Sequence, residues 1–269
     1  MLDYARLIRP ANCVMAALAV YIGSIVAGAN FYPEKDIMYG MLSVFFICGA
    51  GMIANDYFDI SIDKINKPKR PLASGSVSKH FAILYAIILF FAGNFLAFVT
   101  GMQAFYIAIA ASILLLAYAA RLKKTLLIGN FTVSFLVGLT FVYGGVIAQN
   151  YLPAAILGLL ALLSNLGREI FKSVDDMDGD MKHGVKSLPL RIGAKSSRIA
   201  ASCFIFFAVM LSFIPFVAGI FGASYLLSVF IADAFFMAIL FRKGGQAKLC
   251  KVAMLLALIA FLIGAVVKW

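Results

Sequence analysis

A window of nine residues, Asn55 to Asp63, carries one side-chain amide and three carboxylates in the sequence NDYFDISID. If the window is helical, Asn55, Asp59 and Asp63 follow one another at steps of four and share one face. Asp56 stands three residues before Asp59, beside that face. Oxygen atoms are the ligands that Mg²⁺ prefers, and a few carboxylates often hold it together with the phosphates of a substrate. The window therefore predicts one half of a magnesium site.

A second acidic window, Asp175 to Asp180, reads DDMDGD. Asp176 and Asp180 are again four residues apart, and Asp175 directly precedes them. The alternatives are calcium binding and charge-balanced loops. Neither window has the spacing of an EF-hand loop, although Asp176-x-Asp178-Gly179 is similar to its middle. The expected metal ligands are Asn55, Asp56, Asp59, Asp63, Asp175, Asp176 and Asp180, of which Asp59, Asp63, Asp176 and Asp180 are expected to be catalytic.

Basic residues accompany both windows. Lys67 and Arg70 follow the first, Arg168 and Lys172 precede the second, and Lys124 belongs to a basic connection between two apolar stretches. Carboxylates beside cations suit an anionic ligand that is reached through a metal ion on one side and directly by Lys or Arg on the other. A diphosphate fits that description, and we expect these five cations to bind its oxygen atoms.

The stretches that position these residues are strongly apolar. Hydrophobic residues make up 64% of the chain and charged residues 13%, whereas soluble domains carry about 25% charged residues. A membrane-spanning helix needs roughly 20 mostly apolar residues, while the alternation of β-barrel strands is not seen. We therefore expect an all-α polytopic membrane protein whose helices surround a central cavity. The nine expected transmembrane helices lie at about 9–29, 37–58, 80–99, 102–120, 126–148, 151–171, 198–217, 220–241 and 249–267.

The basic residues are divided unequally between the two sides of these helices. The formal charge of +11 would by itself suggest a nucleic-acid partner, but 21 of the 23 Lys and Arg fall on the side of the N-terminus. Only Lys35 and Lys268 fall on the other side. By the positive-inside rule, we expect a cell-membrane protein in contact with lipid, with cytoplasmic N-terminus and site, an outer C-terminus and no nucleic-acid partner. Residues that need no role beyond topology are Arg242, Lys243, Lys248 and Lys251.

Each acidic window ends an apolar stretch and is followed by a basic loop and a new helix start. This weak internal repeat relates Asp63 to Asp180 across four intervening helices, an even number, so both windows face the same side. We expect a single domain, 1–269, in which helices one to four (about 1–120) and five to eight (about 126–241) are pseudo-repeats and the ninth lies at about 249–267. Both windows would then open onto one cytoplasmic cavity.

The chain resembles the UbiA-type intramembrane prenyltransferases over nearly its whole length. Their first motif, N-D-x-x-D-x-x-x-D, is similar to Asn55–Asp63 without a break, and Lys67 and Arg70 look like its usual basic continuation. Their second motif, D-x-x-x-D, is similar to Asp176–Asp180. The resemblance implies nine transmembrane helices, two Mg²⁺ ions bridging the diphosphate between the motifs, and transfer of an isoprenoid chain from its prenyl diphosphate to an acceptor.

Within that family, the chain looks most like the archaeal members that form the second ether bond of archaeal membrane lipid. The segments that carry this likeness are 168–172 (REIFK), the run Asp176–Asp180 and 186–189 (KSLP). This similarity implies Mg-dependent transfer of a geranylgeranyl group from geranylgeranyl diphosphate to a lipid-phosphate acceptor, geranylgeranylglyceryl phosphate. One departure is Ser173, where many relatives are expected to have an aspartate. Transfer to an aromatic acceptor such as 4-hydroxybenzoate, in quinone biosynthesis, stays open as the alternative.

Two other classes of membrane protein also use intramembrane acids. The CDP-alcohol phosphotransferases need the pattern D-G-x2-A-R, and Asp178-Gly179 is not followed by it. A secondary transporter would place its coupling acids near the middle of the bilayer, whereas these acids lie at the cytoplasmic ends of apolar stretches. Both classes are therefore less favoured than a prenyltransferase.

Three further residues are expected to line the cavity. Aromatic faces can stabilise a cationic prenyl fragment, and Tyr57 and Tyr143 lie in suitable helices, although packing is the commoner role of an aromatic residue in such a chain. Asp233 stands alone inside the eighth expected helix, where an ionisable residue indicates function by default. Pairing of Asp233 with a neighbouring helix is the alternative.

Overall fold

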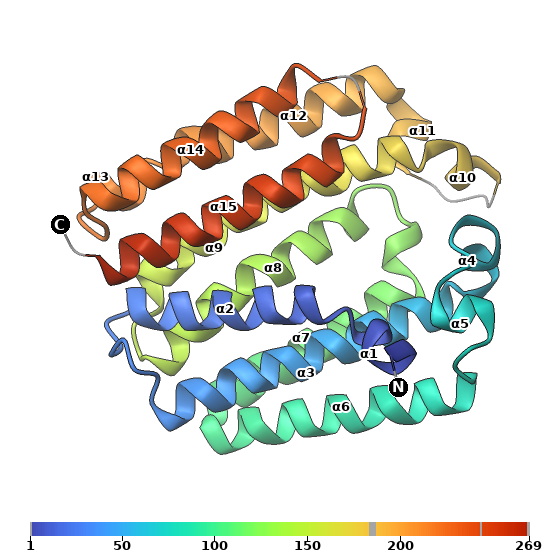
Figure 1. The fold of residues 1–269 in the computed structure, drawn as a ribbon, viewed down its shortest axis with the longest axis horizontal. Helices are drawn as coiled ribbons and strands as arrows, with labels where there is room; N and C mark the ends of the chain where they lie inside the picture. The colour runs from blue at the N-terminus through green and yellow to red at the C-terminus, as the bar shows by residue number, and fades with distance from the viewer. Residues whose placement is uncertain (1, 183–186, 243, 268–269) are drawn as a thin grey trace.

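The computed structural model describes residues 2–182, 187–242 and 244–267. In these residues every regular element is helical, and the long helices run side by side (Figure 1). The long helices are α2 (Pro10–Val26), α3 (Lys35–Phe58), α6 (Lys79–Thr100), α7 (Met102–Ala120), α8 (Ile128–Ile147), α9 (Tyr151–Asp175), α12 (Ala194–Leu211), α14 (Ala223–Leu240) and α15 (Gln246–Val266). The short ones are α1 (Leu2–Ile8), α4 (Ile60–Asn66), α5 (Pro71–Ser74), η1 (Leu122–Lys124), α10 (Met177–Lys182), α11 (Leu188–Ile192) and α13 (Ile214–Val217).

Eight of the described helical segments are long and apolar enough to cross a membrane, and the chain is a multi-pass membrane protein. α2 is apolar but has only 17 residues, or roughly 26 Å at 1.5 Å per residue, while the hydrocarbon core is about 30 Å thick. The expected count of nine transmembrane helices is therefore not confirmed. The difference lies at α2. The helical conformation is interrupted at Arg9, and the helix ends at Val26, before the expected boundary.

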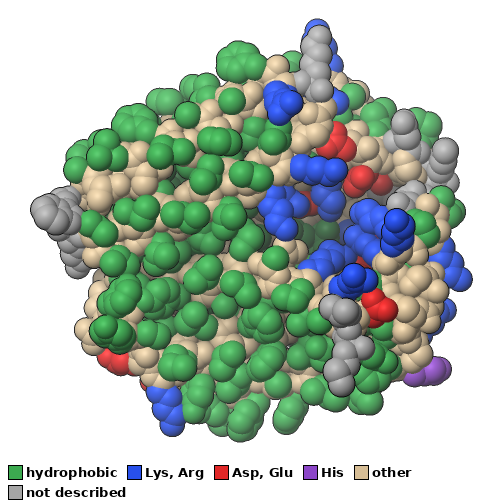
Figure 2. Space-filling view, in the orientation of Figure 1, with side chains coloured by type: hydrophobic (Ala, Val, Ile, Leu, Met, Phe, Trp, Pro, Cys, Tyr) green, Lys and Arg blue, Asp and Glu red, His purple; other side chains and the backbone are tan. Residues whose placement is uncertain are grey.

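On the face that Figure 2 shows, the outer surface of the bundle is apolar along most of its length. Phe91 on α6 and Leu227 on α14, for example, leave 74% and 72% of their surface exposed. Soluble proteins rarely expose large contiguous apolar patches, whereas lipid tails favour such a surface. These side chains therefore face the hydrocarbon of the membrane.

α2 packs directly against α8. A Cβ atom added at Gly144 would lie 2.0 Å from the carbonyl oxygen of Val20, and one added at Gly23 would lie 2.2 Å from that of Phe141. Small residues at such contacts allow the backbones of membrane helices to approach closely. The two glycines therefore fix the position of α2 in the bundle.

Most of the short helices gather at one end of the bundle, which also holds the N-terminus, while the C-terminus lies at the other end (Figure 1). There α3 is followed by α4 and α5, and α9 is followed by α10 and α11. Each acidic window lies where a long helix gives way to these short ones. The charged side chains also concentrate at this end (Figure 2). The fold therefore places both acidic windows and most of the charged residues in view at the same end of the bundle.

Candidate active site

A cavity of about 380 Å³ lies between the long helices, with walls from α2, α3, α7, α8, α9, α12, α14 and α15. Most of the wall is apolar, but the mouth is polar, and Figure 2 shows Lys and Arg side chains around a hollow at the end with the short helices. Such a cavity suits a ligand with a charged head and an apolar tail. The polar residues at the mouth are Arg9, Asn12, Asn55, Asn165, Arg168, Glu169, Lys172 and Lys251.

The first acidic window lies at the junction of α3 and α4. α3 ends at Phe58, and Asp59 (φ −98°, ψ 5°) separates it from α4. The backbone nevertheless keeps the step of four, since the N–H of Asp59 donates to the carbonyl oxygen of Asn55 at 3.1 Å and the N–H of Asp63 donates to that of Asp59 at 2.7 Å. The side chains of the first pair also meet, because Asn55 Nδ2 donates to Asp59 Oδ2 at 3.2 Å.

Asp56 is a buried member of this window, with 3% of its surface exposed. It accepts hydrogen bonds from Arg9 and from Nη1 of Arg70, the latter at 3.1 Å. The same nitrogen of Arg70 lies 2.5 Å from Asp63 Oδ2, so one guanidinium bridges two carboxylates. Buried carboxylates need such partners. Asp56 therefore holds two arginines in place, and Arg70 keeps further N–H groups that a ligand can use.

Arg9 reaches Asp56 from an unusual backbone conformation between α1 and α2. Its φ of 50° and ψ of 68° lie in the left-handed region, which residues other than glycine adopt uncommonly. Its Nη1 also donates to the sulfur of Met52 at 3.5 Å. Strained backbone of this kind persists where the surroundings hold it, and here the buried carboxylate does so.

Lys123, on the connection between α7 and α8, completes the surroundings of Asp59. Its Nζ lies 2.7 Å from Asp59 Oδ1 and donates to Asn55 Oδ1 at 3.4 Å. Burial lowers the pKa of Lys123, and the hydrogen bond to Asp59 opposes that effect. The expected phosphate ligand was the next residue, Lys124, but Lys124 is exposed and the structure brings Lys123 to the window instead. The sequence has no signal for which of two adjacent lysines turns inward.

The second acidic window lies at the junction of α9 and α10. α9 ends at Asp175, Asp176 (φ −93°, ψ 3°) forms the break, and α10 follows. The N–H of Asp180 donates to the carbonyl oxygen of Asp176 at 3.0 Å, so the step of four is kept here too. Asp175 and Asp176 are exposed and Asp180 is half-buried. The side chain of Asp178 and the residues His183 and Lys186 lie outside the described residues.

Glu169 holds two of the expected phosphate-binding cations, although nothing in its spacing marks it as a site residue. Its side chain is buried, one carboxylate oxygen accepts from Arg168, and the other lies 3.5 Å from Lys172 Nζ. Ser173 donates to the carbonyl oxygen of Glu169 at 3.0 Å and accepts from Asn130 on α8 at 3.3 Å. The serine at this position, where many relatives are expected to have an aspartate, therefore joins α8 to α9.

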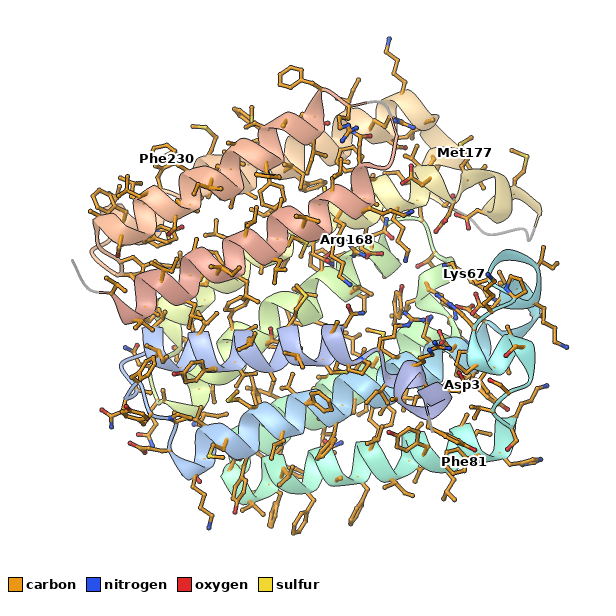
Figure 3. All side chains as sticks on the ribbon, in the orientation of Figure 1. Asp3, Lys67, Phe81, Arg168, Met177 and Phe230 are labelled. Carbon is orange, nitrogen blue, oxygen red and sulfur yellow. The ribbon has the colours of Figure 1, made fainter. Side chains whose placement is uncertain are left out.

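Lys67 is subject to the charges of both windows. Its charge interacts with Asp63 of the first window and with Asp176 of the second. Burial lowers the pKa of Lys67 most, the cations Arg70 and Lys172 lower it further, and the two carboxylates oppose these effects. Figure 3 shows Lys67 at the end of the bundle where the short helices lie. The two windows and their cations therefore share one charged region.

The oxygen donors of the first window suit Mg²⁺ by type and spacing. Among the described residues, no group of three or more His, Cys, Asp or Glu side chains is assembled to hold a metal ion. The acids of the first window pair instead with Arg and Lys side chains. Asn55 and Asp59 nevertheless fit a cation, since the ammonium of Lys123 contacts oxygens of both side chains at once.

Tyr143 on α8 and Asp233 on α14 belong to the cavity wall. The hydroxyl of Tyr143 donates to Ser43 Oγ at 3.4 Å, and Asp233 Oδ2 accepts from Ser212 Oγ at 2.7 Å. Both polar groups are buried and have partners inside the bundle. The partner of Asp233 is a hydroxyl group rather than a cation. Its carboxyl group is therefore part of the cavity wall without an ion-pair partner among the described residues.

The expectation that Tyr57 lines the cavity is not met in the described structure, where its ring packs against the apolar cluster of α1, α3 and α6. An α-helix turns by about 100° per residue. Because Asn55 faces the cavity, a residue two positions later points to the opposite side of α3. The same rotation explains why Cys48, Met52 and Asn55 all belong to the cavity wall.

Lys251 on α15 belongs to the mouth of the cavity, where its Nζ donates to Asn12 Oδ1 on α2 at 2.8 Å. Lys251 was expected to serve topology alone, and the structure places it in the cavity wall. Arg9 and Asn12 also escape prediction, because isolated polar residues at the start of an apolar stretch usually set the position of the helix in the membrane. Their place in the cavity wall depends on the packing of α15 against α2 and α9, which the sequence pattern does not predict.

A protein-family model described as the UbiA prenyltransferase family matches residues 16–267. The chain belongs to the UbiA prenyltransferase family. This prenyltransferase is 37% identical over 271 residues to the digeranylgeranylglyceryl phosphate synthase of Pyrococcus horikoshii, with 98% of each chain covered. It is 40% identical over 275 residues to the enzyme of the same name from Methanocaldococcus jannaschii, with 98% of this chain and 96% of that relative covered.

Solved structures match this prenyltransferase over almost its whole length. One, from work on digeranylgeranylglyceryl phosphate synthase in membranes, has a TM-score of 0.81 and 38% sequence identity, with 98% of each chain covered. A UbiA homologue from Archaeoglobus fulgidus bound to GPP and Mg²⁺ has a TM-score of 0.77 with 97% of this chain and 98% of that chain covered; at 21% identity it shows the fold alone. The expected all-α membrane fold and the expected family are both confirmed.

Proposed function

We propose that this prenyltransferase transfers a geranylgeranyl group from geranylgeranyl diphosphate to geranylgeranylglyceryl phosphate, which forms the second ether bond of archaeal membrane lipid. The observation that carries the proposal is the similarity, at 37% and 40% identity over nearly the whole chain, to relatives named digeranylgeranylglyceryl phosphate synthase. The cavity supports it, because donor and acceptor both combine an isoprenoid chain with phosphate, and the cavity combines an apolar wall with a cationic mouth.

The donor's diphosphate binds at the mouth, between the two acidic windows. Positively charged groups that are already in place where negative charge develops contribute about 3 kcal/mol each to transition-state stabilisation in well-studied enzymes. Lys123 takes the place of Lys124 in the expected set, because its ammonium lies at the first window. The residues that contact diphosphate oxygens are then Lys67, Arg70, Lys123, Arg168 and Lys172.

We assign Mg²⁺ to the oxygen atoms of both windows, with two ions bridging the diphosphate. The contact of one lysine ammonium with Asn55 and Asp59 supports the first half of this site, and the electrostatic influence of Asp63 and Asp176 on Lys67 supports the convergence of the two windows. Bound Mg²⁺ supplies charge that neutralises the diphosphate and makes it a better leaving group. The assigned ligands are Asn55, Asp59, Asp63, Asp176 and Asp180, with Asp56 and Asp175 as alternates.

In the reaction, the bond between C1 of the prenyl chain and the diphosphate oxygen breaks, the hydroxyl oxygen of the acceptor bonds to C1, and the released diphosphate takes up the proton of that hydroxyl. The apolar wall, with side chains such as Leu136 and Leu160, excludes water from the cationic prenyl fragment. Tyr143 belongs to that wall, and an aromatic ring can stabilise positive charge on the fragment. The chain thus positions both reactants and protects the fragment from hydrolysis.

The end of the bundle with the short helices faces the cytoplasm in this proposal, because the positive-inside rule places clustered Lys and Arg there and Figure 2 shows them at that end. The chain forms one domain of residues 1–269, in which α2 to α7 and α8 to α14 are pseudo-repeats. The order of a long helix, an acidic window and two short helices, which occurs after both α3 and α9, supports the repeat.

A competition experiment tests the proposed reaction. Purified protein with Mg²⁺ and geranylgeranyl diphosphate is offered equal amounts of geranylgeranylglyceryl phosphate and 4-hydroxybenzoate, and the products are separated by mass. We expect the lipid ether as the main product. Prenylation of the benzoate alone would contradict the lipid-ether proposal and favour the alternative in quinone biosynthesis, whereas transfer to neither would contradict both.

A further inference from the structure

The mouth of the cavity has a second cationic part, formed by α2, α9 and α15 and centred on Lys251. The hydrogen-bond partner of Lys251 here is the neutral Asn12, at 2.8 Å, and the positive charges of Arg168 and Arg9 act on it. In the described part of the chain, the salt bridges around the mouth do not include Lys251. A lysine near two arginines, with no carboxylate partner among the described residues, contributes to a positive potential that attracts anions.

Arg168 supplies an unused donor beside this lysine. Its Nη1 contacts Glu169 and lies 3.5 Å from Asn165 Oδ1. Its Nε, in contrast, is buried and has no hydrogen-bond partner among the described residues. A buried N–H group without a partner is costly, and an anion bound at the mouth of the cavity would satisfy it.

The apolar wall continues from this point into the cavity along two helices. Met15 follows Asn12 by one helical step on α2, and Met254 and Leu258 follow Lys251 at such steps on α15. Residues three or four apart lie on the same face of a helix. A ligand whose anionic head binds at Lys251 can therefore lay a long apolar tail along α2 and α15. That chemistry matches a lipid phosphate rather than a small aromatic acid, which has no tail.

We propose that Lys251, Asn12 and Arg168 bind the phosphate of the lipid acceptor, at a position separate from the donor's diphosphate. The inference rests on the proposed function, because it names the residues that recognise the acceptor of that reaction. Arg168 serves both positions through different nitrogens. Two neighbouring anion sites that share Arg168 hold the charged ends of the two substrates at the mouth, while the acceptor's hydroxyl approaches C1 of the donor.

The test compares Lys251→Met with a matched control, Lys248→Met, in the full-length protein in detergent with Mg²⁺ and geranylgeranyl diphosphate. Lys248 lies on the same helix and is exposed, outside the described cavity wall. Loss of a charge-assisted hydrogen bond corresponds to about tenfold or more in affinity. We expect Lys251→Met to raise the KM for geranylgeranylglyceryl phosphate by about that factor and to leave the KM for the donor within about twofold.

A second arm removes the phosphate from the acceptor. With geranylgeranylglycerol in its place, the KM of the wild type for the acceptor should rise. The KM of Lys251→Met should change little, because this variant already lacks the interaction between the lysine and the phosphate. Lys251→Arg should restore most of the preference for the phosphorylated acceptor. Lys248→Met should behave like the wild type with both acceptors.

Asn12→Asp guards against a folding defect in Lys251→Met, because it places a carboxylate beside Lys251 without shortening either side chain. We expect it to raise the KM for the phosphorylated acceptor as well, with an unchanged unfolding temperature. An unchanged acceptor KM in both folded variants would overturn the inference while the proposed function stands. Failure of the wild type to use either glyceryl acceptor would overturn the proposed function and this inference together.

Discussion

Lys123 Nζ lies 2.7 Å from Asp59 Oδ1, so the connection between α7 and α8 is joined to the end of α3. Both side chains are largely withdrawn from water, with 11% and 16% of their surface exposed. The same ammonium contacts Asn55 Oδ1. Mg²⁺ has the opposite charge to Asp59, and diphosphate has the opposite charge to Lys123. When both bind, we therefore expect Asp59 to pair with the metal and Lys123 with a phosphate oxygen.

Replacement of this lysine tests which basic residue of the loop serves the site. Lys123→Met removes the cation at the first window, whereas Lys124→Met removes an exposed neighbour. We expect kcat/KM for the prenyl diphosphate to fall by about a hundredfold in Lys123→Met and at least tenfold less in Lys124→Met. Steady-state transfer assays at saturating acceptor measure both values. An equal loss in the two variants would contradict a specific role of Lys123.

Glu169→Gln should weaken the interactions that hold Arg168 and Lys172 in place. The buried carboxylate contacts Arg168 and lies 3.5 Å from Lys172, and an amide keeps its shape but not its charge. We expect the KM for the prenyl diphosphate to rise about tenfold, since hydrogen bonds to charged groups contribute about 1.5–3 kcal/mol. Glu34→Gln, near the other end of the bundle, serves as the control. A donor KM equal to that of the wild type would show that Glu169 does not position these cations.

Asp56→Asn should destabilise the fold more than it alters chemistry. The carboxylate is 3% exposed and holds Arg9 and Arg70, and breaking a buried ion pair costs about 3–5 kcal/mol. Asp3→Asn is a matched control at the surface, where the pair with Arg6 is exposed and contributes less than about 1 kcal/mol. Chemical unfolding in detergent compares the two free energies of unfolding. A smaller loss in Asp56→Asn than in Asp3→Asn would contradict this account of the buried cluster.

Gly144→Ala tests the close approach of α2 to α8. The added methyl group would lie 2.0 Å from the carbonyl oxygen of Val20, which belongs to backbone and cannot rotate away. Overpacking of this kind costs about 1–3 kcal/mol, and we expect a lower unfolding temperature. Gly51→Ala is the control, because its methyl group would meet only the flexible end of Leu115, at 3.1 Å. Equal unfolding temperatures in the two variants would show that the helices can separate without loss.

The parts of this protein that could be predicted from the sequence are those with a local signal. Apolar length predicts the membrane helices, and the step of four within Asn55–Asp63 and Asp176–Asp180 predicts both windows, because each depends only on neighbouring residues. The position of Tyr57 away from the cavity also follows from the rotation of a helix once Asn55 is placed. That Asn55 and not Tyr57 faces inward, however, is decided by the packing of α3.

The residues that escaped prediction have partners far away in the chain. Lys123 meets Asn55 across 68 positions, and Lys251 meets Asn12 across 239. No spacing rule connects residues at such separations, and each of these cations has the ordinary appearance of a topology signal. The short α2 escaped for a related reason, since its start depends on the backbone of Arg9, which its contact with Asp56 holds in place.

The central claim, that both acidic windows hold Mg²⁺ around one diphosphate, is tested most directly by the Mg²⁺ dependence of geranylgeranyl diphosphate binding. The comparison uses the wild type, Asp59→Ala and Asp180→Ala, each checked for folding by its unfolding temperature in detergent. We predict that Mg²⁺ strengthens binding at least tenfold in the wild type, that a chelator removes this gain, and that either substitution abolishes both the gain and prenyl transfer. Retention of Mg²⁺-dependent binding and full transfer in either folded variant would contradict the claim.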